Sequence, residues 1–218
     1  MIRGAGAPPL TFLLAVLASA VAWHAAARDL VETPMFRDDV LAGKKPPVEQ
    51  RVPATPLVVG FDGKTAAPGR HGGILNTIIG RSRDLRLLVV YGYARLVGYD
   101  TRLNIVPDIL ESLDVKEGRE FTLKLRKGHR WSDGHPFTSE DFRYYWEDVA
   151  NNRELSPTGP PSDLMVDGEP PQFEVLDDLT VSYTWSKPNP DFLTRMAGAS
   201  PLFIYRPAHY LRAYHKKY

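Results

Sequence analysis

The 218-residue chain contains no cysteine. This absence excludes a disulfide framework, a thiolate nucleophile and the commonest structural zinc sites. It also excludes the lipid-bearing cysteine that would tether an exported lipoprotein. An excess of charge of one sign is missing as well, because 27 basic residues balance 26 acidic ones. Without a basic surface, we expect no nucleic-acid partner.

Motifs that mark a catalytic or metal site are also missing. No serine stands in a Gly-x-Ser-x-Gly elbow, and the six histidines form no His-x-x-x-His pair. Adjacent carboxylates such as Glu140 and Asp141 are more typical of a helix start than of a general acid and base. We therefore predict no enzyme, no metal and no cofactor. A secreted serine hydrolase with a concealed nucleophile is the alternative.

Residues 1–27 have the pattern of a secretory signal peptide. Arg3 gives a positive start, residues 10–22 form an apolar run, and Ala25-Ala26-Ala27 offers a small-residue cleavage site. The run is short for a membrane span, and an anchor that stays attached is the alternative reading. With no lipoprotein cysteine, this pattern predicts a protein that is free in the periplasm.

Residues 28–71 are polar and interrupted by proline, which prevents helices and favours extended surface backbone. We expect this segment to be an extended, proline-rich leader, with structured sequence from Gly72 onward. The prolines of the leader are Pro34, Pro46, Pro47, Pro53, Pro56 and Pro68.

Beyond the leader, period-two alternation and turn residues predict strands and hairpins. Hairpin turns are expected at Glu117-Gly118 and at Asp177-Asp178, and the alternation of Val181, Tyr183 and Trp185 predicts one buried face. The loop at 151–171 is long and proline-rich, as functional or mobile loops are. The expected strands are 74–79, 109–114, 121–125, 179–183 and 202–205, and the expected helices begin at Thr138, Pro188 and Pro207.

The stretch from Leu123 to Phe142 combines a strand, a turn and a helix start. Asp133-Gly134 supplies the turn, because glycine accepts a positive φ. Thr138 is suited to cap the helix, with the Asp141 carboxylate in its first turn. We interpret Trp131, Asp133, Gly134, Thr138 and Asp141 as a structural motif in which Trp131 packs over the sheet edge.

This stretch resembles family 5 of the bacterial extracellular solute-binding proteins, the peptide-binding receptors of ABC importers. The family motif runs from Leu-Arg-Lys-Gly through an aromatic residue and Asp-Gly to Pro-x-Thr-x-x-Asp. Here these places are filled by Leu125-Arg126-Lys127-Gly128, Trp131, Asp133-Gly134 and Pro136 to Asp141. Matching segments are Gly72 to Leu75, Val106 to Leu113, Phe173 to Val175 and Leu179 to Tyr183.

The resemblance implies an α/β fold with a mixed β-sheet and packed helices, as part of the first lobe of a type 2 periplasmic-binding-protein fold. Family members are far longer and close two lobes around the ligand. We therefore expect residues 72–218 to be a partial N-terminal lobe, with the C-terminal lobe absent and the chain an N-terminal fragment.

The implied function is capture of oligopeptides or similar small solutes for an ABC transporter permease, by a monomer. In the family, the loop after the opening strand and the aromatic segment after it line the ligand cleft. Carried over, Gly80, Arg81, Ser82, Tyr91 and Tyr93 are the predicted ligand-binding residues. The competing interpretations are a solvated loop with core tyrosines for this segment, and a stand-alone envelope interaction module for the chain.

Overall fold

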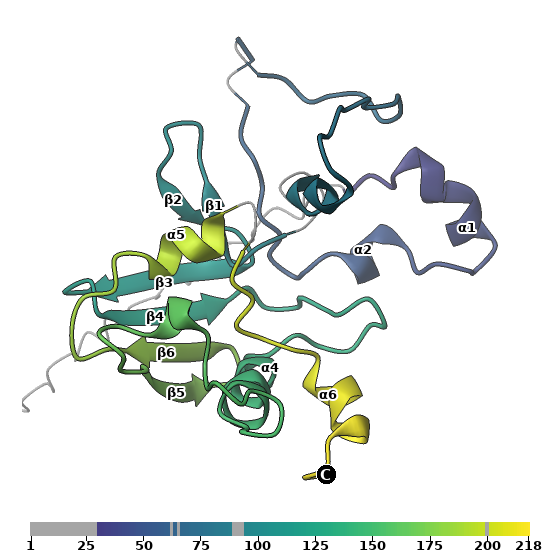
Figure 1. The fold of residues 1–218 in the computed structure, drawn as a ribbon. Helices are drawn as coiled ribbons and strands as arrows, with labels where there is room; N and C mark the ends of the chain where they lie inside the picture. Colours follow the sequence, from purple (N-terminus) through teal and green to yellow (C-terminus); the bar gives the residue numbers. More distant parts are fainter. Residues whose placement is uncertain (1–29, 62, 65, 89–93, 199–200) are drawn as a thin grey trace, which may run out of the picture. The chain divides into compact units, whose positions relative to one another are not determined.

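The computed structural model describes residues 30–61, 63–64, 66–88, 94–198 and 201–218 (Figure 1). The chain divides into two units, residues 1–31 and 32–218, and the second contains nearly all described residues. The expected signal peptide therefore lies outside the described residues. In the ranges given above, no helix combines the length and the apolar character that crossing a membrane requires.

A four-stranded sheet forms the centre of the second unit. Its order is β3-β4-β6-β5, and each neighbouring pair is antiparallel. A separate antiparallel pair, β1 with β2, completes the described strands. The bounds are β1 Val97–Tyr99, β2 Ile105–Pro107, β3 Leu110–Lys116, β4 Glu120–Leu125, β5 Gln172–Asp177 and β6 Thr180–Thr184.

The predicted α/β class, with helices packed on a sheet, is confirmed. Both predicted hairpins are present: β3 turns into β4 at Glu117-Gly118, and β5 turns into β6 after Asp177. Glu117 and Gly118 both have positive φ, the conformation that a tight hairpin turn requires. Hairpins join β3 to β4 and β5 to β6, and β4 also pairs antiparallel with β6 across the helices between them. The pairing among described strands is therefore antiparallel throughout, without the parallel pair that a mixed sheet would add.

One face of this sheet carries the core. Residues two apart in a strand point to the same face, so the alternating apolar side chains of β4 and β6 are buried together. Helix α5 (Phe192–Ala197) covers this face through Phe192, whose ring centroid lies 4.8 Å from that of Trp185 and 5.0 Å from that of Phe121. The predicted core residues Val181, Tyr183 and Trp185 are all buried.

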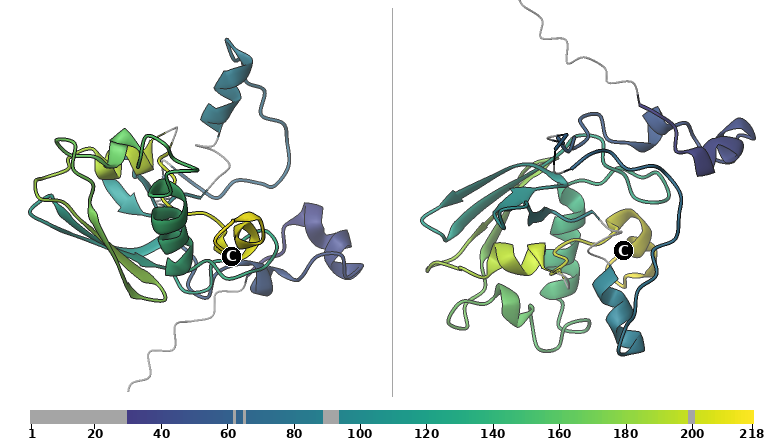
Figure 2. Two further views of the ribbon diagram at one scale, coloured as in Figure 1. Left: turned by 60° about the horizontal axis from the view of Figure 1, so that its bottom comes forward. Right: turned by 90° about the horizontal axis from the view of Figure 1, so that it is seen from above.

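Helix α4 (Ser139–Arg143) continues into a wider helical turn, η3 (Tyr144–Ala150), and lies beside β5 and β6 (Figure 2). Its first turn has a capping box, formed by the Thr138 side chain with the Asp141 backbone and by the Asp141 carboxylate with the Thr138 backbone. Phe142 and Tyr145 are buried, so the helix presents its apolar stripe to the sheet.

The leader contains helices that the proline pattern did not predict. They are η1 (Pro34–Phe36), α1 (Arg37–Leu41) and α2 (Val48–Arg51). The prolines bound these short helices, because proline is tolerated at a helix start, and Asp38 and Asp39 stand in the first turn of α1 where the helix dipole favours negative charge.

Two expected strands are absent from the described structure. Residues 74–79 and 202–205 have no regular secondary structure, because no other described strand pairs with them, and a strand needs a partner to satisfy its backbone. The remaining helices are η2 (Ser82–Leu88), η4 (Ser162–Leu164), α6 (Ala208–Leu211) and η5 (Arg212–Tyr214). The predicted final helix from Pro207 is therefore confirmed, whereas the one from Pro188 begins later, at Phe192.

Gly128 allows the leader to approach the sheet closely. Its φ is +95°, and a Cβ atom there would lie 2.8 Å from the Ala54 nitrogen, which donates a hydrogen bond of 3.0 Å to the Lys127 carbonyl. We expect Gly128→Ala to lower the free energy of unfolding by about 1–3 kcal/mol and to expose the leader to proteolysis.

Gly134→Ala is the matched control, since Gly134 has a φ of +90° but no neighbour within 4 Å of a built Cβ. Urea titration and limited proteolysis of both variants separate backbone strain from loss of the leader contact. Equal protease sensitivity of the two variants would contradict this contact.

Candidate functional site

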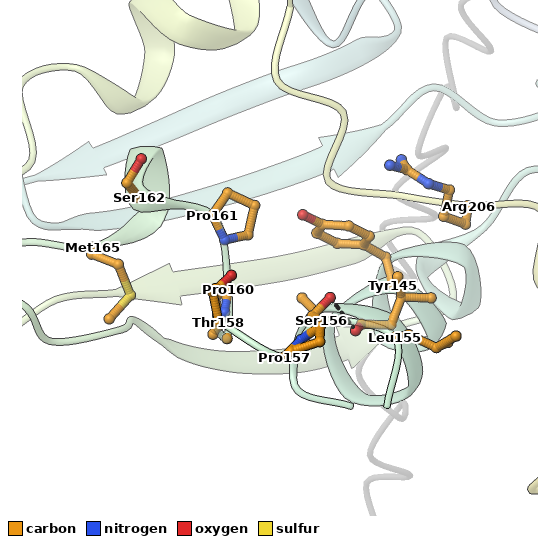
Figure 3. Close-up of a pocket in the computed structure, with 13 residues that line it drawn as sticks. Tyr145, Leu155, Ser156, Pro157, Thr158, Pro160, Pro161, Ser162, Met165 and Arg206 are labelled. Atoms are coloured by element: carbon orange, nitrogen blue, oxygen red, sulfur yellow. Dashed lines mark hydrogen bonds between the residues drawn. The ribbon is translucent and has the colours of Figure 1, made fainter. Parts of the chain in front are cut away.

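The candidate site is a pocket of about 670 Å³ between a helix and the proline-rich loop (Figure 3). Tyr145, Val149 and Ala150 of η3 form one wall, residues 155–162 form another, and Arg206 reaches in from the C-terminal segment. The loop that the sequence marked as functional or mobile is therefore part of a concave surface, which is the usual setting for a small ligand.

A second pocket of about 310 Å³ adjoins the first. Both are lined by Tyr145, Pro161 and Arg206, and the second adds the oppositely charged side chains of Asp163 and Arg195. The three shared residues lie at the boundary between the pockets, so a single extended ligand can contact both.

Tyr145 and Arg206 are held against each other at this boundary. The Tyr145 side chain is 4% exposed, and the Arg206 guanidinium carbon lies 5.0 Å from its ring centroid, within the range of a cation–π contact. Burial raises the pKa of the Tyr145 phenol, an effect that the Arg206 charge partly opposes. The phenol is therefore protonated at neutral pH and can donate a hydrogen bond.

The loop wall of the pocket is built for shape more than for catalysis. Pro157, Pro160 and Pro161 restrict its backbone. The Ser156 hydroxyl donates a hydrogen bond of 2.9 Å to the Val149 carbonyl, whereas a serine nucleophile needs a positioned base. This geometry gives no support to the serine hydrolase alternative.

Asp141 connects the helix of Tyr145 to the segment of Arg206. Its side chain is 3% exposed, and its Oδ2 accepts hydrogen bonds from Trp131 Nε1 at 3.1 Å and Thr138 N at 3.0 Å. Its Oδ1 accepts from Ala208 N at 3.0 Å, and its carbonyl accepts from Arg206 N at 3.0 Å. The capping carboxylate of the motif thus also fixes one wall of the pocket.

The aromatic and turn residues of the motif lie around this carboxylate. The Trp131 ring is partly buried and packs edge-on against Phe137, with centroids 5.4 Å apart. Gly134 has positive φ, and its nitrogen donates to the Trp131 carbonyl at 2.9 Å, forming the turn. Trp131 therefore faces the core, consistent with its interpretation as a structural residue.

Asp133 makes a contact that the sequence does not signal. Its Oδ2 lies 2.6 Å from Nε2 of His209, whose ring stacks on that of His135 with centroids 3.8 Å apart. The His209 hydrogen bond lowers the pKa of the Asp133 carboxyl. Among the described residues, no group of three or more His, Cys, Asp or Glu side chains could hold a metal ion.

Those predicted ligand-binding residues that the structure describes line neither pocket. Gly80, Arg81 and Ser82 are exposed and line neither pocket, and the Arg81 nitrogen donates to Asp84 Oδ2 at 3.1 Å. Tyr91 and Tyr93 lie outside the described residues. A ligand-binding role for these five residues stays a prediction.

A buried carboxylate on η3 predicts a pH dependence of stability. Asp148 is 2% exposed and accepts hydrogen bonds from Lys217 Nζ at 2.5 Å and Tyr218 Oη at 2.7 Å. Burial acts to raise its pKa, but these hydrogen bonds and the nearby cations outweigh burial, and the pKa is lowered. The carboxylate therefore stabilises the fold above its unfolded pKa of about 3.9, and this contribution is lost as pH falls through the lower folded pKa.

We expect Asp148→Asn to melt below wild type at pH 7, with a loss of roughly 1–3 kcal/mol because hydrogen bonds to a charged group weaken. The difference in stability between wild type and Asp148→Asn should narrow as pH falls below about 4. Asp178→Asn, at an exposed carboxylate, is the control. Thermal unfolding at pH 7, 4 and 3 tests this expectation, and a gap that is constant over this range would refute it.

A pocket with a proline-stiffened wall, several hydroxyls and an arginine at its boundary has the features of a small-molecule binding site. Comparison with family models matches residues 104–216, just over half of the chain, to "Bacterial extracellular solute-binding proteins, family 5 Middle". The chain belongs to this family, and the resemblance noted in the sequence is confirmed.

Two related proteins illustrate the sequence similarity. The periplasmic alpha-galactoside-binding protein of Rhizobium meliloti is 29% identical over 203 residues, covering 82% of this chain and 28% of that protein. The periplasmic oligopeptide-binding protein OppA of Escherichia coli is 33% identical over 98 residues, covering 39% of this chain and 18% of that protein.

Solved structures show the same fold. An oligopeptide-binding protein OppA superposes with a TM-score of 0.68 at 32% identity, covering 87% of this chain and 29% of that one. The periplasmic binding protein MelB of Agrobacterium fabrum C58, in complex with stachyose, gives a TM-score of 0.57 at 25% identity, covering 87% and 31%. The chain thus spans less than a third of the length of these relatives.

Proposed function

We propose that this protein captures a small solute and delivers it to an ABC importer without changing the solute chemically. The pocket bounded by Tyr145, residues 155–162 and Arg206 carries the proposal, because it lies in the part of the chain that matches the solute-binding family. Its two adjoining chambers suit an extended ligand.

The solute in this proposal is an oligopeptide or a similar small molecule. Relatives support both a peptide and a sugar, since they are named for oligopeptides and for alpha-galactosides. The pocket offers groups for either class: hydroxyls of Ser156, Thr158 and Ser162, and the aromatic ring of Tyr145.

We further propose that the protein acts in the periplasm as a monomer and meets a membrane permease there. Supporting this, relatives are named periplasmic binding proteins, and residues 1–27 have the pattern of a signal peptide. Capture without chemistry is supported by the engaged Ser156 hydroxyl in the pocket.

Isothermal calorimetry of the full chain against a panel of tripeptides, tetrapeptides, raffinose and stachyose tests the function. We expect saturable binding of at least one solute, and mass spectrometry should recover that solute unchanged. Thr158→Trp, which places a large ring in the pocket wall, should weaken binding tenfold or more. Thr101→Trp, on the exposed turn between β1 and β2, is the matched control.

Two outcomes would count against the proposed function. One is the absence of binding to every solute of the panel by a chain that melts cooperatively. The other is the recovery of a hydrolysed solute, which would favour an enzyme. Equal weakening by Thr158→Trp and Thr101→Trp would move the binding site away from the pocket.

A further inference from the structure

The charges that line the two adjoining pockets do not cancel. Three charged side chains line them: Asp163, Arg195 and Arg206. Asp163 and Arg195 form an ion pair, with Arg195 Nε 3.3 Å from Asp163 Oδ1. Arg206 forms no ion pair with an acid in the described part of the chain. One positive charge is therefore left at the boundary between the pockets.

The donors of Arg206 are only partly used by the protein. Its Nη1 donates to the backbone carbonyls of Tyr205 at 2.7 Å and Phe203 at 3.2 Å. Its Nε and Nη2 have no protein partner among the described residues. These two nitrogens share one edge of the guanidinium plane, and their parallel N–H bonds match the two oxygens of a carboxylate.

The Arg206 guanidinium is also held in place before any ligand binds. The backbone nitrogen of Arg206 donates a hydrogen bond to the Asp141 carbonyl. Two residues further on, the backbone nitrogen of Ala208 donates to the Asp141 carboxylate. Figure 3 shows the guanidinium above the Tyr145 ring at the edge of the pocket. A pre-positioned donor pair loses little entropy when it binds, which favours its use in recognition.

We propose that Arg206 binds a carboxylate group of the solute through Nε and Nη2, with the Tyr145 ring as its support. This inference rests on the proposed function and adds a specificity to it: the solute is an acid. The carboxylate can belong to a peptide or to a sugar acid, and both present the same pair of oxygens.

Two matched pairs of probes test this specificity by calorimetry on the full chain. Trialanine is compared with trialaninamide, and galacturonate with galactose. In at least one pair we expect the acid to bind tenfold or more tightly than its neutral partner, since hydrogen bonds between two charged groups are the stronger kind. The pair that shows the preference identifies the source of the carboxylate.

Variants of Arg206 connect the preference to this side chain. Arg206→Met should abolish the preference for the acid, and Arg206→Lys should keep part of it, because lysine retains the charge without the paired donors. Arg153→Met is the control, because Arg153 is an exposed arginine of the proline-rich loop at 151–171 and lines neither pocket. Thermal melting of each variant verifies that it is folded.

The proposal is overturned if the acid binds no more tightly than its neutral partner in either pair, or if Arg206→Met keeps the preference for the acid to the same extent as Arg153→Met. It is also overturned if neither pair binds. In each of these cases the wider panel of peptides and galactosides still decides the proposed function, because a neutral solute on that panel can bind without Arg206.

Discussion

Replacing Asp141 with alanine will lower the free energy of unfolding by roughly 3–5 kcal/mol. The substitution leaves three donors without their acceptor: Trp131 Nε1, Thr138 N and Ala208 N. Each buried donor that loses its partner costs about 1–3 kcal/mol, and the helix cap is lost as well. Because Trp131 is only partly buried, water can compensate for part of this loss.

Chemical denaturation of the Asp141 variant is compared with that of two others. Asp178→Ala, at an exposed carboxylate in the β5–β6 turn, should change stability by less than about 0.5 kcal/mol. Asp141→Asn should fall between the two, because one oxygen still accepts while the amide group faces donors. If Asp141→Ala is as stable as Asp178→Ala, this carboxylate does not hold the motif to the C-terminal segment.

The second large effect is expected at the centre of the aromatic core. Trp185 is 2% exposed, packs edge-on against Phe121 and Phe192, and donates from Nε1 to the Leu164 carbonyl at 2.9 Å. We expect Trp185→Ala to cost about 3–5 kcal/mol, the usual range for removing a buried aromatic side chain. Leu164 belongs to the proline-rich loop that lines the pocket, so the loss of this hydrogen bond should also make the pocket wall less ordered.

Two tryptophan variants separate packing from hydrogen bonding at this position. Trp185→Phe keeps a ring in the core and loses only the donor to Leu164, so its cost should be smaller. Trp146→Ala removes the same side chain from a partly buried position and should also cost less. If Trp185→Ala and Trp146→Ala unfold at the same urea concentration, Trp185 contributes no more to the stability of the core than Trp146 does, and this expectation is refuted.

Much of the fold was predictable because its information is local. The alternation in β4 and β6 identified the buried face, and the hairpin turns were marked by residues that suit turns. The cap formed by Thr138 and Asp141 depends on residues three apart, a spacing that is visible in the sequence. The leader helices escaped prediction because proline at a helix start resembles proline in a loop.

The candidate site was harder to predict because it joins distant segments. Tyr145 lies on η3, and Arg206 is more than sixty residues further along the chain. No local pattern places these two side chains together, since the link runs through tertiary contacts of Asp141. The one usable signal was the long proline-rich loop at 151–171, which suggested a function without naming its partners.

Hydrogen–deuterium exchange with a bound solute tests the central claim, that the pocket between η3 and the proline-rich loop holds the ligand. The chain is measured with and without the tightest-binding solute of the calorimetry panel. We predict slower exchange in residues 155–165 and around Arg206, with unchanged exchange in β4. Protection confined to residues 80–83, with none in the proline-rich loop, would contradict the claim and favour the loop predicted from the sequence.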